Sequence, residues 1–222
     1  MKKIALMGAV ALFGLSNAQI AKGTSYLSGQ VGYFHNESHE SAFKRKDDII
    51  RILPTAGYFV TTNLAVGLGI GYKSAVTKNN IGNDSVGNVV QTKDTDNAFV
   101  VVPFVRKYWT LSDKLFVFGQ LQVPVEFGKE KLDANSYIYS GDPFLDPSSS
   151  RKNSYTNVGV NIRPGLDYFI SKNWSVEATI GEFGYNSYKR DIDGARRAGD
   201  YKVGISLASV TLGVKYVFVK NK

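Results

Sequence analysis

The sequence predicts an all-β protein, an eight-stranded antiparallel up-and-down barrel that spans a membrane. Three observations lead to this prediction: a short apolar segment at the amino terminus, eight later segments in which apolar residues alternate with small or polar ones, and connections that are alternately short and long. Together they indicate an exported chain whose strands each have one apolar face.

The first residues have the pattern of a secretory signal peptide. Two lysines precede an apolar run from Ile4 to Leu15, and Ser16-Asn17-Ala18 supplies the small residues of a cleavage site. The apolar run is shorter than the roughly 20 residues of a membrane-spanning helix. We therefore expect residues 1–18 to be a signal peptide that is removed, and residues 19–222 to form one barrel domain.

Period-two alternation defines the expected strands, because successive side chains of a strand point to opposite faces. In the third segment, Leu64, Val66 and Leu68 share one face, and alanine and glycines occupy the other. The segments are Ser25–Phe34, Ile49–Val60, Leu64–Lys73, Ala98–Trp109, Leu115–Phe127, Tyr155–Ile170, Trp174–Tyr185 and Tyr201–Phe218. In the last segment the alternation shifts by one residue near Ala208, which predicts a β-bulge.

The connections between these segments differ in length at the two ends of the expected barrel. The short ones lie at Thr61–Asn63, Thr110–Lys114 and Ser171–Asn173. The long ones are expected to be loops at His35–Asp48, Ser74–Asn97, Gly128–Ser154 and Asn186–Asp200. Short turns at one end and long loops at the other are typical of bacterial outer-membrane barrels.

A weak internal repeat marks the short turns. Pro54, Tyr58-Phe59 and Asn63-Leu64 recur as Pro164, Tyr168-Phe169 and Asn173-Trp174, and a copy longer by one residue begins at Pro103. Aromatic side chains at the ends of strands are typical of a membrane interface. The expected aromatic girdle consists of Tyr58, Tyr108, Trp109, Tyr168, Trp174, Tyr216 and Phe218.

A soluble barrel, with its apolar face inside, is the main alternative. The more polar face of the segments consists mostly of Gly, Ala, Ser, Thr and Asn with isolated charges, whereas a soluble exterior would carry many more Lys and Glu. Small residues fit a crowded interior, so the apolar face is expected to contact lipid.

The Tyr-Phe-x-x-x-Asn turns and the closing strand Val210–Phe218, with Tyr216 and Phe218 on one face, are shared with known proteins. On these residues the mature chain resembles the small outer-membrane barrels of the OmpA-transmembrane, OmpX and OmpW kind, although four residues follow Phe218. The resemblance implies a monomer in the outer membrane, in contact with outer-membrane lipids and lipopolysaccharide, and inserted by the barrel-assembly machinery.

Charged residues on the inward face are the candidate functional residues. Alternation directs these side chains into the barrel: Arg51, Arg106, Glu126, Arg163, Asp167, Glu177 and Lys215. Unpaired burial of charge is costly, so we expect the three arginines to pair with some of the carboxylates. An eight-stranded interior is just wide enough to be filled by side chains, which favours a structural plug over the alternative of a gate or selectivity element.

Other motifs carry less information. His35 and His39 leave a strand for an expected loop, where a solvated polar segment is favoured over a metal site because no further ligands have recognisable spacing. The basic loops Lys44–Lys46 and Arg196-Arg197 suit either contact with lipopolysaccharide phosphates or ordinary solubility. The loop segments Tyr137–Tyr139 and Asp142–Pro147 contain aromatic residues, which suit either contact with a partner or packing within their own loop.

Two functions therefore remain open. The first is a structural or surface-interaction barrel with a plugged lumen and loops that are available for a partner. The second is a narrow porin-like channel for small or apolar solutes. The basic residues are scattered, and a net charge of +8 without a nucleic-acid motif predicts no nucleic-acid partner. We expect no cofactor, no metal and no enzyme activity, since no convincing nucleophile–base pair occurs.

Overall fold

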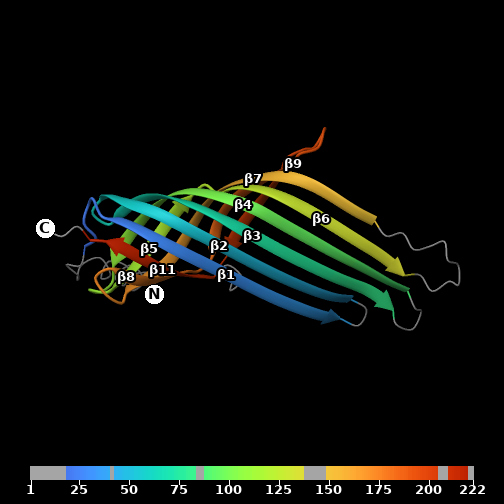
Figure 1. The fold of residues 1–222 in the computed structure, drawn as a ribbon, viewed down its shortest axis with the longest axis horizontal. Coiled ribbons are helices and arrows are strands. Elements are labelled where there is room, and N and C mark those ends of the chain that lie inside the picture. The colour runs from blue at the N-terminus through green and yellow to red at the C-terminus, as the bar shows by residue number, and fades with distance from the viewer. Residues whose placement is uncertain (1–18, 41–42, 84–87, 138–148, 205–209, 220–222) are drawn as a thin grey trace, which may run out of the picture.

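The computed structural model describes residues 19–40, 43–83, 88–137, 149–204 and 210–219, which form one antiparallel sheet (Figure 1). Its strands are β1 (Ser25–Glu40), β2 (Phe43–Thr61), β3 (Leu64–Asn83), β4 (Asn88–Thr110), β5 (Leu115–Gln122), β6 (Val125–Tyr137), β7 (Ser149–Phe169), β8 (Trp174–Thr179), β9 (Glu182–Arg190), β10 (Ala198–Gly204) and β11 (Thr211–Phe218). No helix in these ranges is long and apolar enough to cross a membrane. The expected signal peptide, residues 1–18, and the bulge near Ala208 lie outside the described residues.

The strands close into a ring, which confirms the predicted all-β architecture. β1 pairs β2 on one side and, over Ser25–Val31, pairs β11 on the other. β5 and β6 occupy one place in the ring, because both pair β4 on one side and β7 on the other. β8 and β9 occupy the next place: both pair β7 on one side, and on the other side β8 pairs β11 and β9 pairs β10. Pro124 separates β5 from β6 because proline cannot donate a ladder hydrogen bond, and Gly181, at φ 82°, separates β8 from β9.

The apolar face of the strands points outward, as predicted for contact with lipid. On β3, Val66 and Leu68 are 38% and 44% exposed, while Ala65 between β2 and β4 is fully buried. Exposed aromatic residues border this apolar belt at both ends. Those near the short turns are Tyr58, Trp109, Tyr168, Trp174 and Phe218, and those at the far end are Tyr33, Tyr72, Phe99, Phe127 and Tyr185.

Tyr108 is a correction to the expected girdle, because its side chain is 1% exposed and lies in the lumen. In the repeat copy at Pro54, Tyr58 faces outward and the neighbouring Phe59 faces inward. The copy at Pro103 has one more residue before its aromatic pair. A shift of one residue reverses the faces of a strand, so Trp109 takes the lipid side and Tyr108 the inside.

The strands are longer than the alternation predicted, and this corrects the expected long loops. β1 continues to Glu40 and β2 begins at Phe43, so most of 35–48 is a ladder; the same holds for β3 with β4 and for β6 with β7. Beyond the apolar belt both faces carry polar residues, which removes the period-two signal while the backbone hydrogen bonds continue. In Figure 1 these outer parts of β1, β2, β3, β4, β6 and β7 project together from the barrel, away from the short turns.

Aromatic rings fill the lumen near the short turns. Tyr26, Phe59, Tyr108, Phe116 and Phe118 form a buried cluster, against which Phe169 packs. Glycines on the inward face make room for these rings: a Cβ at Gly57 would come within 2.3 Å of the Tyr26 ring, and one at Gly165 within 2.3 Å of the Phe118 ring. The small residues of the inward face thus allow large side chains from neighbouring strands to cross the lumen.

Candidate functional site: the charged plug of the lumen

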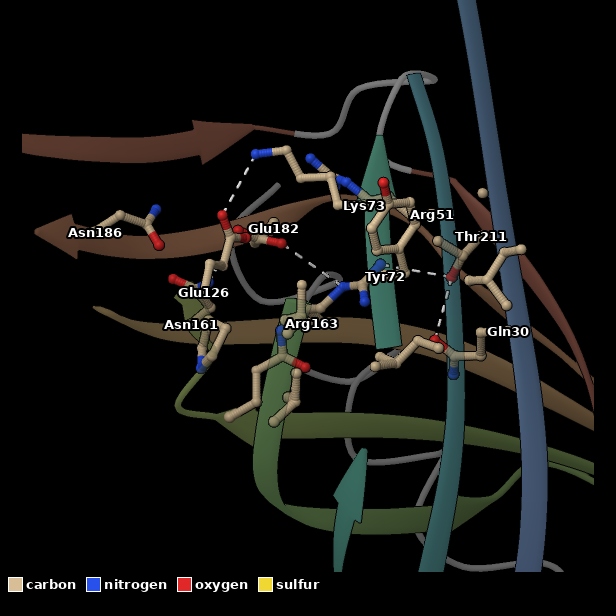
Figure 2. A pocket seen from close by; sticks show the side chains of 17 residues that line it. Gln30, Arg51, Tyr72, Lys73, Glu126, Asn161, Arg163, Glu182, Asn186 and Thr211 are labelled. Atoms are coloured by element: carbon tan, nitrogen blue, oxygen red, sulfur yellow. Dashed lines mark hydrogen bonds and ion pairs between the residues drawn. The ribbon is translucent and has the colours of Figure 1, made fainter. Parts of the chain in front are cut away.

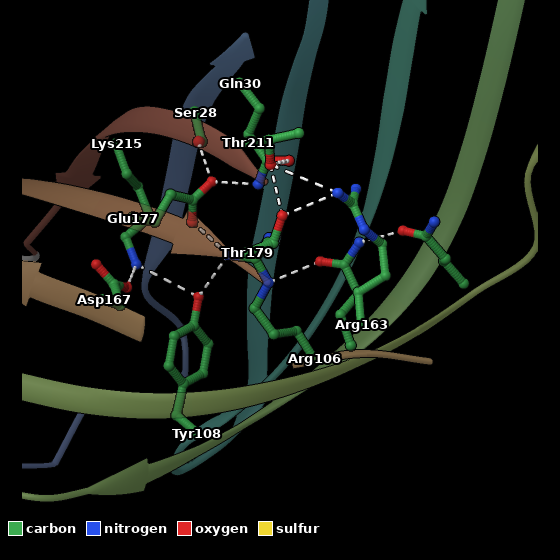
Figure 3. A network of polar contacts seen from close by, with 12 residues as sticks. Ser28, Gln30, Arg106, Tyr108, Arg163, Asp167, Glu177, Thr179, Thr211 and Lys215 are labelled. Atoms are coloured by element: carbon green, nitrogen blue, oxygen red, sulfur yellow. Dashed lines mark hydrogen bonds and ion pairs between the residues drawn. The ribbon is translucent and has the colours of Figure 1, made fainter. Parts of the chain in front are cut away.

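Two ion pairs lie in the lumen (Figure 3), and their cations pack against rings of the aromatic cluster. Arg106 of β4 binds Glu177 of β8 with 2.5 Å between Nη1 and Oε2, and Lys215 of β11 binds Asp167 of β7. All four side chains have 0% exposure. We call these four residues the charged plug.

Hydrogen bonds saturate Glu177 and hold Arg106 in place. Ser28 and Gln30 of β1 each donate to Glu177 Oε1 at 2.6 Å, and Arg106 occupies the other carboxylate oxygen. Arg106 Nε donates to Gln120 Oε1 at 2.7 Å, and its guanidinium carbon lies 4.2 Å from the centre of the Phe118 ring. The three donors stabilise the carboxylate, so Glu177 is held by a network and not only by one opposite charge, whereas Arg106 Nη2 has no hydrogen-bond partner in the described part of the chain.

Tyr108 joins the two ion pairs. Its hydroxyl accepts hydrogen bonds from Arg106 Nη1 at 3.2 Å and from Lys215 Nζ at 3.3 Å. The Lys215 ammonium also lies 4.9 Å from the centre of the Tyr108 ring and 5.1 Å from that of Phe169. Cations pack favourably on aromatic faces, so the aromatic cluster stabilises the charged groups of Arg106 and Lys215 that contact it.

Arg163 of β7 forms the next layer away from the turns. Its Nη2 donates to Thr179 Oγ1 at 2.8 Å and reaches Thr211 Oγ1 at 3.5 Å, and its Nε lies 3.9 Å from Glu182. Its partners are therefore two hydroxyls and a more distant carboxylate. None of Glu126, Asp167 and Glu177, the partners expected from the sequence, binds it directly.

A cavity of about 80 Å³ lies above this layer (Figure 2). Arg51, Lys73, Glu126, Arg163 and Glu182 are among its lining residues. The arginines were expected to pair with some of Glu126, Asp167 and Glu177; Glu177 binds Arg106, whereas Glu126 pairs with Lys73 at 3.4 Å. Arg51 makes no ion pair or side-chain hydrogen bond with the described part of the chain, so the carboxylate partner expected for it is not found among those residues.

The plug separates this cavity from the turn end of the barrel. A recess of about 460 Å³ at that end is lined by residues that include Ile20, Phe116 and Phe169. None of the four plug residues lines either the cavity or the recess. The arrangement therefore places paired, desolvated charges across the lumen between two hollows.

Sequence reasoning missed several members of the network. Lys73, Gln120 and Glu182 face inward, and Ser28 and Gln30 supply donors to Glu177. Nothing in the sequence showed which inward residues share a depth. The strand register, which brings Glu177 opposite Asp167 and Gly213, supplies that information.

Other residues considered from the sequence lie away from the plug. His35 binds Asp48 across β1 and β2 at 2.7 Å, and His39 lies 3.4 Å from Glu37, all on the outer parts of strands. Lys44–Lys46 is part of β2 and not a loop, whereas Arg196 and Arg197 are exposed between β9 and β10. Residues 138–148, with most of the loop aromatics, lie outside the described ranges.

The chain resembles known proteins, both in solved structures and in one family model. Solved structures that resemble the chain include OprG of Pseudomonas aeruginosa (11% identity, 89% of this chain and 97% of that one, TM-score 0.45) and Ail, the attachment invasion locus protein of Yersinia pestis (14%, 89% and 99%, 0.35). No curated protein sequence matches the chain. The model of a family described as the outer membrane protein β-barrel domain matches residues 5–218. With that match and a ring of strands whose apolar face points outward, the chain belongs to this family of outer-membrane β-barrels.

Proposed function

We propose that this outer-membrane barrel is closed, that its role is structural or one of surface interaction, and that the outer ends of its strands with their connections meet the partner. The main support is the charged plug: two ion pairs with 0% exposure cross the lumen between the outer cavity and the turn-end recess. A hydrated pore would leave such charges in contact with water. The proposal includes no catalytic step and no cofactor.

Planar-bilayer recording of the refolded protein tests the closed lumen. Wild type is expected to give only small or rare conductance events. Glu177→Ala removes one plug charge and is expected to raise conductance or to lower stability, whereas Asp193→Ala, at an exposed position between β9 and β10, is the matched control and should change neither. Steady large conductance in wild type, unchanged by Glu177→Ala, would contradict the proposal.

A narrow channel for small or apolar solutes is the second candidate. The observation that favours it is the cavity of about 80 Å³ with Arg51 in its lining, since Arg51 has no ion pair in the described part of the chain. A conducting wild type whose current falls on Arg51→Gln would support this second function.

A further inference from the structure

The outer cavity is lined by charged groups that the chain pairs unevenly. These residues are Arg51, Lys73, Glu126, Arg163 and Glu182. Both carboxylates have partners, because Glu126 lies 3.4 Å from Lys73 Nζ and Glu182 accepts a hydrogen bond from Asn161 at 2.9 Å. Arg51, by contrast, makes no ion pair or side-chain hydrogen bond with the described part of the chain. The cavity therefore has a cation without a carboxylate of its own among those residues.

Other buried lining groups also lack a hydrogen-bond partner in the residues that the structure describes. Arg163 is 6% exposed, and its Nε makes no hydrogen bond, with Glu182 3.9 Å away. Asn186, also 6% exposed, has an unused Nδ2 donor, whereas Asn161 has an unused Oδ1 acceptor. With Arg51 added, unused donors outnumber unused acceptors among these described residues.

Arg51 and Arg163 lie on opposite walls of the lumen. β3, β4 and the place shared by β5 and β6 separate β2 from β7 on one side, and β1, β11 and β8 separate them on the other. Figure 2 shows both side chains among those that line this one cavity. Ile50 and Ile52, which flank Arg51, are 42% and 48% exposed on the lipid side, so the cavity lies within the apolar belt. Two like charges in such surroundings are costly, and a bound anion would neutralise them.

The rest of the lining limits the size and character of a ligand. Leu53, Val100, Val102 and Pro124 form an apolar wall. The cavity volume of about 80 Å³ corresponds to roughly five to eight non-hydrogen atoms, at about 10–15 Å³ for each water-sized unit. A ligand must therefore be small, and a short carbon chain beside its charge would gain from contact with the apolar wall.

We propose that the outer cavity binds a short-chain organic carboxylate, with its carboxylate group between Arg51 and Arg163 and its carbon chain against the apolar wall. A planar guanidinium presents paired donors that match the two oxygens of a carboxylate. A zwitterionic ligand is disfavoured, because Glu126 and Glu182 already have partners and are not available to an ammonium group. The site goes beyond the surface role proposed above, since its ligand is held inside the lumen.

The test compares two single variants of β2 that lose the same charge. Arg51→Gln removes the guanidinium from the cavity. Arg45→Gln is the matched control, because Arg45 is an exposed residue of the same strand, six positions farther from the short turns. Sodium propionate is titrated into each refolded protein in uncharged micelles and low-chloride buffer at neutral pH, and saturation-transfer NMR gives the dissociation constant. Alanine, 1-propanol, propylammonium and inorganic phosphate are the comparison ligands, and heat-modifiability on a gel confirms that each variant is folded.

Wild type and Arg45→Gln are expected to bind propionate alike, and Arg51→Gln at least tenfold more weakly. Arg51→Lys keeps the charge but not the paired donors, so it should also bind more weakly than wild type, and it replaces Arg51→Gln if that variant does not fold. Propanol and propylammonium should not bind detectably.

An absence of propionate binding to wild type would overturn the proposal. Equal binding by wild type and the folded Arg51 variant would overturn it as well, as would tighter binding of phosphate or alanine than of propionate. Planar-bilayer conductance is recorded on the same wild-type protein. Propionate binding without current supports both the site and the closed lumen, whereas negligible current without propionate binding overturns the site and leaves the closed barrel standing.

Discussion

The ion pairs in the two halves of the lumen differ in burial and in the number of their hydrogen-bond partners. Toward the short turns, Arg106 and Glu177 are fully buried and have further hydrogen-bond partners on β1 and β5. Toward the outer end, Lys73 and Glu126 form a pair 3.4 Å apart with side chains 17% and 18% exposed. Both pairs arise from the same inward alternation. We therefore expect depth in the barrel, and not the presence of an ion pair alone, to decide how much a charge contributes to stability.

The largest effect should follow from Glu177→Ala. This change leaves the Arg106 guanidinium buried without its carboxylate, which costs about 3–5 kcal/mol of unfolding free energy in a dry site. Urea unfolding of the refolded protein in micelles measures the change. A loss below about 1 kcal/mol would show that water reaches the plug and that the two halves are alike.

A double-mutant cycle measures how strongly Arg106 and Glu177 depend on each other. Arg106→Met combined with Glu177→Leu replaces the pair with apolar side chains, which is often nearly neutral for a buried ion pair. The double variant should therefore be more stable than either single variant, Arg106→Met or Glu177→Leu. Additive losses would show that Arg106 and Glu177 contribute independently.

The alternation of apolar and polar residues shows on which face of a strand a side chain lies. The outward apolar belt and the inward direction of Arg106, Glu177 and Lys215 could therefore be predicted from the sequence. The alternation does not record depth, so it could not show which charges meet: Glu126 pairs with Lys73, which lies two strands away on the other side of β4. Tyr108 was misplaced because one inserted residue in its repeat reverses the face.

The strand ends were missed for a different reason. Alternation of apolar and polar residues requires two different environments, and beyond the belt both sides of β3 and β4 are polar. The ladder nevertheless continues to Asn83 and Asn88, where backbone pairing needs no apolar face. A sequence of this kind therefore indicates where the membrane ends and not where the strand ends.

Gly165→Val should have an intermediate effect, confined to the turn half. A Cβ at this position would come within 2.3 Å of the Phe118 ring and 2.6 Å of the Ala178 carbonyl oxygen. Overpacking of a filled interior typically costs about 1–3 kcal/mol. Gly29→Val, where nothing lies within 4 Å of the added Cβ, is the matched control. Equal unfolding midpoints for the two variants would mean that the aromatic cluster is loosely packed.

Glu126→Ala should have a smaller effect than Glu177→Ala. It removes the partner of Lys73, but Lys73 keeps its 2.8 Å contact with Asp96 and the cavity admits solvent. The loss in unfolding free energy is expected to be about 1 kcal/mol or less. A loss as large as that of Glu177→Ala would extend the dry plug into the outer half of the lumen.

Shortening the chain between Lys131 and Arg151 should have the smallest effect on folding. The change removes the last paired residues of β6 and β7, including Leu132 opposite Arg151, but retains Val125 opposite Val158 inside the apolar belt. Strands within the membrane satisfy their backbone groups with each other, so closure of the barrel does not require the outer ends. The shortened protein should keep its heat-modifiable form on a gel and a urea midpoint near that of wild type. Loss of the folded form would show that the outer ends of the strands are required for folding, as the half near the short turns is.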